Sequence, residues 1–147
     1  MKLSLVIASI LFATWATPVC AKTAVVVIAI STGITDLSSI EVRKAYFAIP
    51  TTKNGYQIIA LRNEGDTQLN RVFLQALVSM TEIDYDRRLL ALATQNGRQR
   101  PRIIYHQDEL ISILTTSPGH ISIVWLDQLT PKLLTELHVV RVLWQSS

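Results

Sequence analysis

Residues 56–80 read YQIIALRNEGDTQLNRVFLQALVSM, and the hydrophobic pattern of this stretch changes twice along its length. Residues 56–61 form a short apolar run, which predicts a strand. Residues 62–67 are polar and include Gly65, which predicts a loop. From Leu69 onward the apolar side chains recur at helical spacing, so we expect a helix that lays one broad face on the core. The apolar positions of this helix are Leu69, Val72, Phe73, Ala76, Leu77 and Met80.

The segment before this unit predicts a first strand and a capped helix. Residues 24–30 are a β-branched run too short for a buried helix, and turn-forming residues 31–33 follow it. Ser38 and Glu41 fit a capping box, in which the serine accepts from the Glu41 amide and the glutamate accepts from the Ser38 amide. A short helix to about residue 47 and a turn over residues 50–55 are therefore expected.

The segment after it continues the alternation of helices and strands. Thr81 with Asp84 predicts the cap of another helix, and Gly97 suits its left-handed C-terminal position. A basic loop, residues 98–102, then leads to a strand candidate at residues 103–105.

The last part of the chain adds a helix around residues 110–114, a turn at 117–119 and a strand at 120–125. A short helix is expected from Pro131, since proline is tolerated at the first helical position, and a strand over 139–144 closes the chain. This alternation predicts an α/β sheet layered by helices.

The N-terminus has the three regions of a secretory signal peptide. Lys2 is followed by an apolar run over residues 3–15, and small side chains at Val19 and Ala21 place the cut after Ala21. An uncleaved membrane anchor is one alternative, although the run is shorter than the ~20 residues that a spanning helix needs. A lipoprotein attached at Cys20 is another. We therefore expect a signal peptide over residues 1–21, and one periplasmic domain over residues 22–147 that does not span the membrane.

Cleavage of the signal peptide would limit the side chains that are available for chemistry in residues 22–147. Cleavage removes Cys20, the only cysteine, so no disulfide or thiolate ligand remains. It also removes one of the 14 Lys and Arg residues, which leaves a small positive charge against 11 Asp and Glu residues. The basic residues form no long run beside exposed aromatic side chains, so a nucleic-acid role is not indicated.

Several short motifs, taken in order, resemble the phosphate-binding-protein-like family of short periplasmic substrate-binding domains. They are the serine-capped helix at 37–47 with Ala48 in place of a glycine, the Asn54-Gly55 turn, the segment RNEGD at 62–66, Gly97 with Pro101, and PGHISIV at 118–124 with Ser122 in place of a glycine. The resemblance implies an α/β fold that is a single lobe of a type II periplasmic-binding-protein-like fold, with a mixed sheet of about five strands flanked by helices.

The same resemblance implies a ligand-binding loop. Arg62 would hold phosphate or another small oxyanion, Glu64 would orient that arginine, and Gly65, Asp66 and Thr67 would present amides or a hydroxyl. Physical chemistry agrees with such a role, because the start of a helix favours an anion and an arginine can make two parallel contacts to its oxygens.

Asp66 opens an alternative for this loop, because the family's phosphate binders have a serine there. Two like unit charges at about 5 Å and an effective dielectric of about 20 repel by roughly 3 kcal/mol. The dipole at a helix start offers an anion only about 0.3 to 1 kcal/mol. Asp66 is then the cap of its own helix, and it occupies the amides that phosphate would use.

The remaining polar residues point to no enzymatic chemistry. Arg98, Arg100 and Arg102 form either an anion or partner patch or a solvated edge. Asp84 and Asp86 suit the dipole at a helix start better than they suit a catalytic pair. No nucleophile elbow, phosphate-cradling loop or dinucleotide fingerprint is present, and the histidines lack metal-ligand spacing, so we expect no catalytic residue, no metal and no cofactor. The histidines are His106, His120 and His138.

Two functions follow from these observations. The first is a periplasmic solute-binding-like protein that takes phosphate or another small oxyanion, for a membrane transporter or for sensing. The alternative is a ligand-free interaction module that contacts a membrane sensor or an envelope protein, because a single lobe offers no opposite wall to close over a ligand. An uncharacterised hydrolase is a weaker third possibility.

Overall fold

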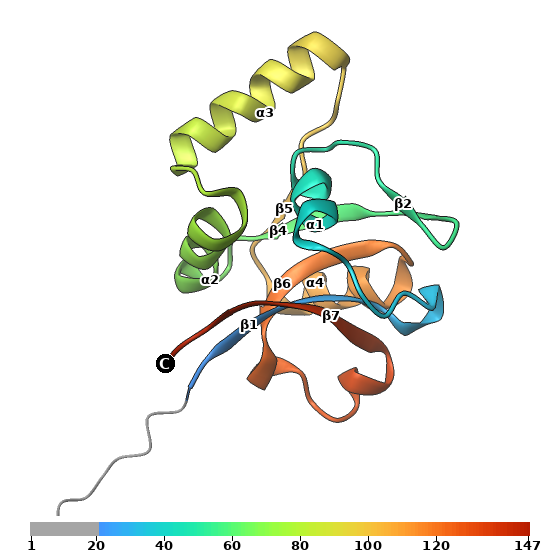
Figure 1. Ribbon diagram of the computed structural model, residues 1–147. Coiled ribbons are helices and arrows are strands. Elements are labelled where there is room, and N and C mark those ends of the chain that lie inside the picture. The colour runs from blue at the N-terminus through green and yellow to red at the C-terminus, as the bar shows by residue number, and fades with distance from the viewer. Residues whose placement is uncertain (1–20) are drawn as a thin grey trace, which may run out of the picture.

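A five-stranded mixed sheet with helices on both faces forms the body of the molecule in the computed structural model, which describes residues 21–147 (Figure 1). The strand order is β5-β4-β6-β1-β7, with β4 parallel to β5 and β6, and β1 antiparallel to β6 and β7. The strands are β1 Thr23–Ala29, β4 Ile59–Asn63, β5 Arg102–Ile104, β6 His120–Trp125 and β7 Leu137–Gln145. The α/β class and the mixed sheet of five strands are confirmed, whereas the predicted signal peptide lies outside the described residues except for Ala21.

Helices cover the two faces of the sheet unequally. They are α1 Ser39–Tyr46, α2 Thr67–Val72, α3 Glu82–Asn96 and α4 Gln107–Thr116. Because side chains alternate along a strand, β1 serves two cores. Val26 packs in the cluster that includes residues of α1, α2 and α3, and Val25 packs in the cluster that includes Leu110 and Leu114 of α4.

The predicted helix caps are confirmed at atomic detail. Ser38 Oγ accepts from the Glu41 amide at 3.1 Å, and the Ser38 amide donates to Glu41 Oε2 at 2.7 Å. Thr81 Oγ1 accepts from the Asp84 amide at 3.2 Å, and α3 is followed by Gly97, whose φ of +64° lies in the left-handed region.

The predicted strand over residues 56–61 is wrong in its bounds, because the chain divides at Ile58. A hairpin of β2 Thr52–Lys53 and β3 Tyr56–Gln57 comes first, and β4 follows. The Ile58 amide donates to Thr51 O at 2.8 Å, whereas the Ile59 amide donates to Gly119 O at 3.0 Å, at the start of β6. As a consequence Arg62 belongs to β4, not to a loop.

Two predicted helices also differ in form. After Val72, α2 continues into a π-helical segment, Phe73–Val78, which buries the predicted positions Phe73 and Leu77 and also Val78. The prediction of Ala76 as a core position is wrong, because the wider π turn leaves it exposed. The helix expected from Pro131 is a single 3₁₀ turn, Leu133–Thr135, because β7 begins soon after it at Leu137.

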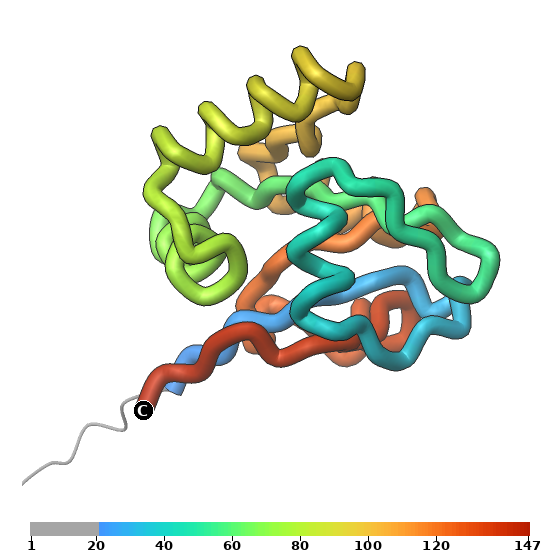
Figure 2. Tube along the Cα trace, turned by 45° about the horizontal axis from the view of Figure 1, so that its top comes forward, coloured from blue at the N-terminus to red at the C-terminus, as the bar shows by residue number. Residues whose placement is uncertain are grey.

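The two ends of the described chain lie side by side (Figure 2). Thr23 of β1 faces Gln145 of β7, and the Ser146 amide donates to Lys22 O at 2.8 Å. None of the helices within residues 21–147 has both the length and the apolar character that a bilayer crossing requires.

Candidate functional site

The predicted ligand residues lie at the carboxyl ends of the parallel strands. β4 ends at Asn63, and its parallel neighbours β5 and β6 end at Ile104 and Trp125. Ligands of open α/β sheets bind beyond this edge. The position of residues 62–67 in the fold is therefore one that a ligand site would occupy.

Arg62 itself is buried, with only 4% of its surface exposed. Its guanidinium carbon lies 5.3 Å from the centre of the Phe73 ring and 4.9 Å from the centre of the Tyr85 ring. Both rings present a negative face to the cation. The side chain thus lies inside the core between the sheet and the helices, away from open solvent.

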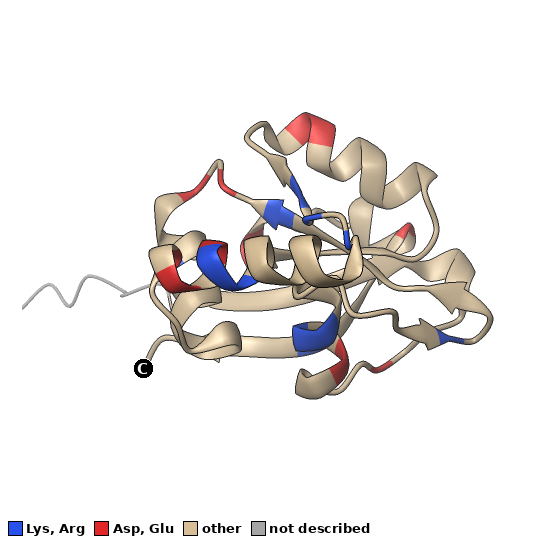
Figure 3. Cartoon of the chain, turned by 90° about the horizontal axis from the view of Figure 1, so that it is seen from above, with Lys and Arg blue, Asp and Glu red and all other residues tan. Residues whose placement is uncertain are grey.

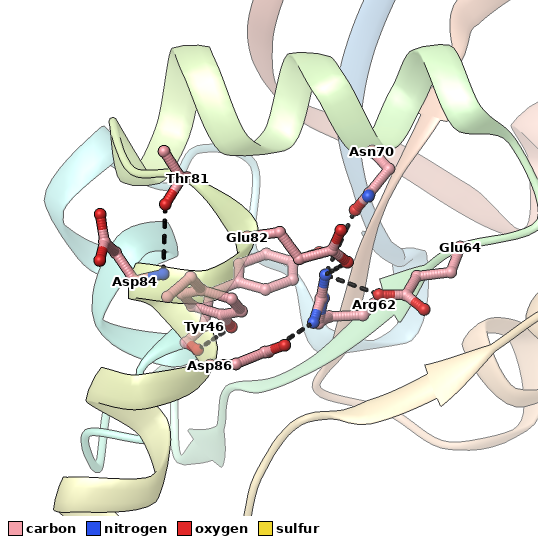
Figure 4. A network of polar contacts seen from close by, with 9 residues as sticks. Tyr46, Arg62, Glu64, Asn70, Thr81, Glu82, Asp84 and Asp86 are labelled. Carbon is pink, nitrogen blue, oxygen red and sulfur yellow. Dashed lines mark hydrogen bonds and ion pairs between the residues drawn. The ribbon is translucent and has the colours of Figure 1, made fainter.

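Three carboxylates and an amide surround this guanidinium (Figure 4). Nη2 lies 2.6 Å from Glu64 Oε1 and 3.6 Å from Glu82 Oε1, and Nη1 lies 3.4 Å from Asp86 Oδ1. Nη2 also donates to Asn70 Oδ1 at 3.3 Å. We call Arg62, Glu64, Asn70, Glu82 and Asp86 the Arg62 cluster.

The Arg62 cluster leaves little room or charge for an anion. One guanidinium faces three carboxylates, so at neutral pH an incoming anion meets an excess of negative charge. The cavity beside Arg62 measures about 10 Å³, which is close to the smallest space that holds one water molecule. Phosphate binding to Arg62 would require the cluster to open.

Neutral hydroxyl groups tie the surroundings of Arg62 to the sheet. Tyr46 Oη and Ser122 Oγ both donate to Leu61 O, at 3.0 and 2.9 Å, and Tyr85 Oη donates to Tyr46 O at 2.5 Å. Burial raises the pKa of Tyr46 and Tyr85 far above the ordinary value, so both remain donors at neutral pH. Ser122, at a position where the family motif has glycine, thus joins β6 to β4.

Asp66 caps α2, which confirms the alternative interpretation of this residue. Its Oδ1 accepts from the amides of Gln68 and Leu69, at 2.9 and 3.1 Å. Its Oδ2 accepts from Trp125 Nε1 at 2.9 Å. Both carboxylate oxygens therefore accept hydrogen bonds from within the protein, while Thr67 is the exposed first residue of α2.

Gly65 has a steric reason to be glycine. A Cβ at this position would overlap the backbone carbonyl of Tyr105, at the end of β5. The Glu64 amide donates to Ile104 O at 3.0 Å in the same place. The loop is thus pressed onto β5, and glycine permits this close approach.

Four residues of this site were not predicted from the sequence to belong to it. They are Asn70, Glu82, Asp86 and Trp125. The spacing of Glu82 and Asp86 was an available signal, because residues four apart share one face of a helix. That face of α3 contacts Arg62. Asp84 lies on the surface instead, where its Oδ1 is 3.6 Å from Arg87 Nη1. Asp86 was attributed to the helix dipole alone, and its contact with Arg62 corrects that interpretation.

Within residues 21–147 no group of three or more His, Cys, Asp and Glu residues is arranged to hold a metal ion. No family model matches this sequence, and no curated protein matches it at a significant level. The resemblance to phosphate-binding-like domains therefore remains a prediction.

Proposed function

We propose that this protein is an exported, non-enzymatic interaction module built on a single lobe of a type II periplasmic-binding-protein-like fold. The observation that carries the proposal is the Arg62 cluster, in which the protein's own carboxylates take the place of an oxyanion. The mixed sheet with helices on both faces is compatible with such a lobe. Phosphate binding at residues 62–67 is the competing function, and the experiment below separates the two.

The energetic argument favours the closed cluster. Each carboxylate within about 5 Å of a bound anion would repel it by roughly 3 kcal/mol at an effective dielectric of about 20. A guanidinium that already faces three carboxylates can offset only part of that repulsion. Residues 62–67 then serve to hold β4, α2 and α3 together.

Helix α3 offers a surface for a protein partner. It projects from the body of the molecule (Figure 2) and buries Tyr85 and Leu89 on its inner face. Ile83 and Leu90, two turns apart, are 71% and 56% exposed. Two large apolar side chains on one exposed helix face are typical of an anchor that enters an apolar groove.

Charged residues border this apolar pair. Acidic residues gather at the start of α3, Arg87 and Arg88 follow them on the same helix, and further basic residues lie after its end in the loop before β5 (Figure 3). Such a border of acidic and basic groups orients a partner and selects against wrong ones. We propose that the partner is a membrane sensor or an envelope protein with an apolar groove.

Site-specific photo-crosslinking in living cells tests this function. A photoreactive amino acid at position 83 or 90 should give one reproducible crosslinked partner, whereas the same group at exposed Lys132, outside α3, should not. The product at position 90 should disappear in the variant Ile83→Asp. Identical products from all three positions, or no product together with saturable phosphate binding that Arg62→Lys abolishes, would contradict the proposal.

A further inference from the structure

A second hollow lies at the opposite end of the parallel strands from the Arg62 cluster. Its volume is about 330 Å³, within the range of about 300 to 1,000 Å³ that small-molecule sites occupy. Backbone of β4, the end of α1 and the basic loop at residues 98–102 enclose it. The lining residues that matter to its chemistry are Ala48, Ile49, Ala60, Arg98, Arg100 and His120.

The hollow exists because β5 is shorter than β4. Pairing of β4 with β5 begins at Leu61 and Arg102, so no strand lies beside Ile59 and Ala60 on that side. On the other side both residues pair with β6. The basic loop and the end of α1 lie around the uncovered edge without filling it.

The strand geometry directs one backbone donor into this gap. The Ile58 amide donates to Thr51 O on one side of the strand, and the Ile59 amide donates to Gly119 O on the other. Successive amides of a strand alternate in direction, so the Ala60 amide points to the same side as that of Ile58. There it lies beyond the end of the β4–β5 ladder and faces the hollow.

The charge of the lining is one-sided. Arg98, Arg100 and Arg102 all contribute, and no Asp or Glu lines the hollow. Arg102 pairs with Glu109 outside it, whereas Arg98 and Arg100 form no ion pair with any residue in the described part of the chain. The hollow therefore attracts an anion.

His120 adds an imidazole ring whose tautomer is fixed by the backbone carbonyl of Ser117. Its Nδ1 lies 3.1 Å from Ser117 O, an atom that can only accept, so Nδ1 carries a hydrogen. Nε2 is thus left for another partner.

We propose that this hollow binds a small organic carboxylate with an apolar body. Arg98, Arg100 and the Ala60 amide would receive the carboxylate, and the apolar side chains of Ala48, Ile49 and their neighbours would cover the body. An inorganic anion would leave this apolar wall without a partner. The site is independent of the proposed function, because Ile83 and Leu90 do not line it.

Benzoate is a suitable probe, with neutral benzamide and inorganic phosphate as matched comparisons. In NMR titrations of the purified protein, benzoate should shift the Ala60 amide resonance and saturate, at lower concentration than either comparison. The double variant Arg98→Gln/Arg100→Gln should weaken benzoate binding by about a hundredfold, since each lost charge-assisted hydrogen bond reduces affinity by about tenfold or more. Arg87→Gln, on exposed α3, should leave it unchanged.

Three results would overturn the proposal. They are no saturation with benzoate, shifts confined to residues outside the hollow, and equal binding of benzoate and benzamide. Thermal unfolding of each variant shows whether it is folded, and the location of the shifts in the unaltered protein tests the site without any variant. A failed crosslink at positions 83 and 90 would bear only on the proposed function.

Discussion

A guanidinium buried between two aromatic rings needs counter-charges, because an isolated buried ion is very costly. Glu64 supplies the closest one, and its side chain is only 16% exposed. Glu82 and Asp86 are about half exposed and complete the cluster from α3. Arg62 thereby joins a strand to two helices.

Replacing Arg62 with alanine should destabilise the protein by about 3 to 5 kcal/mol, because it leaves Glu64 partly buried without its cation. Urea unfolding measures the free energy directly. Glu82→Gln is the matched control, and its effect should stay within about 1 kcal/mol, since that partner is exposed. Equal effects of the two substitutions would contradict this account of the cluster.

Gly65→Ala should cost about 1 to 3 kcal/mol, because its Cβ must displace the Tyr105 backbone. At Gly55 a Cβ would meet nothing within 4 Å, so Gly55→Ala reports only the strain of a positive φ. Thermal unfolding of both variants separates the clash from the strain. A harmless Gly65→Ala would show that the loop does not press on β5.

At the scale of single residues, the sequence predicted those roles that depend on near neighbours. Ser38, Glu41, Thr81 and Gly97 act within a few residues along the chain, so their spacing reveals them. Glu64 is two residues from Arg62, but the other partners of Arg62 come from segments 8 to 24 residues away. Only the packing of α2 and α3 on β4 brings them together.

At the scale of single helices, the first turn of α2 depends on its cap, Asp66. Asp66→Ala should destabilise the protein by about 0.5 to 2 kcal/mol through the lost cap, with a further cost because Trp125 Nε1 loses its acceptor. Asp66→Asn keeps an acceptor oxygen for the helix amides and should cost less. Chemical unfolding compares the two, and equal losses would indicate that the negative charge matters more than the cap.

The start of α1 should respond to pH through Glu41. Its hydrogen bond from the Ser38 amide lowers the pKa of Glu41 below 4.5. A lowered folded-state pKa gives stability that is present above the unfolded-state pKa and is lost as the pH falls through the folded-state value. The melting temperature of the natural protein should therefore fall more steeply below pH 4.5 than that of Glu41→Gln. Parallel curves would refute this.

Helices α1 and α3 were predicted correctly because their caps agree with their hydrophobic periodicity. Strand β6 was predicted from its apolar, β-rich run after a turn. The division of residues 56–61 was missed because Ile58 and Ile59 are alike as residues, and only their amide partners on opposite sides separate two strands. The shortness of β5 was equally hidden, since its length is set by where β4 lies beside it.

The whole molecule has two unlike ends along its parallel strands. At the carboxyl end, Arg62 and Asp66 are occupied by partners within the protein. At the amino end, a basic hollow remains beside Ala60. An α/β domain whose carboxyl end is closed in this way fits the proposed interaction module better than a phosphate carrier.

A phosphate titration of the purified protein, followed by NMR at the amides of residues 64–67, tests the closed Arg62 cluster most directly. We predict no saturable shift of these amides at millimolar phosphate. Saturable shifts that disappear in Arg62→Lys would contradict the account, because they would show that the carboxylates yield Arg62 to an oxyanion.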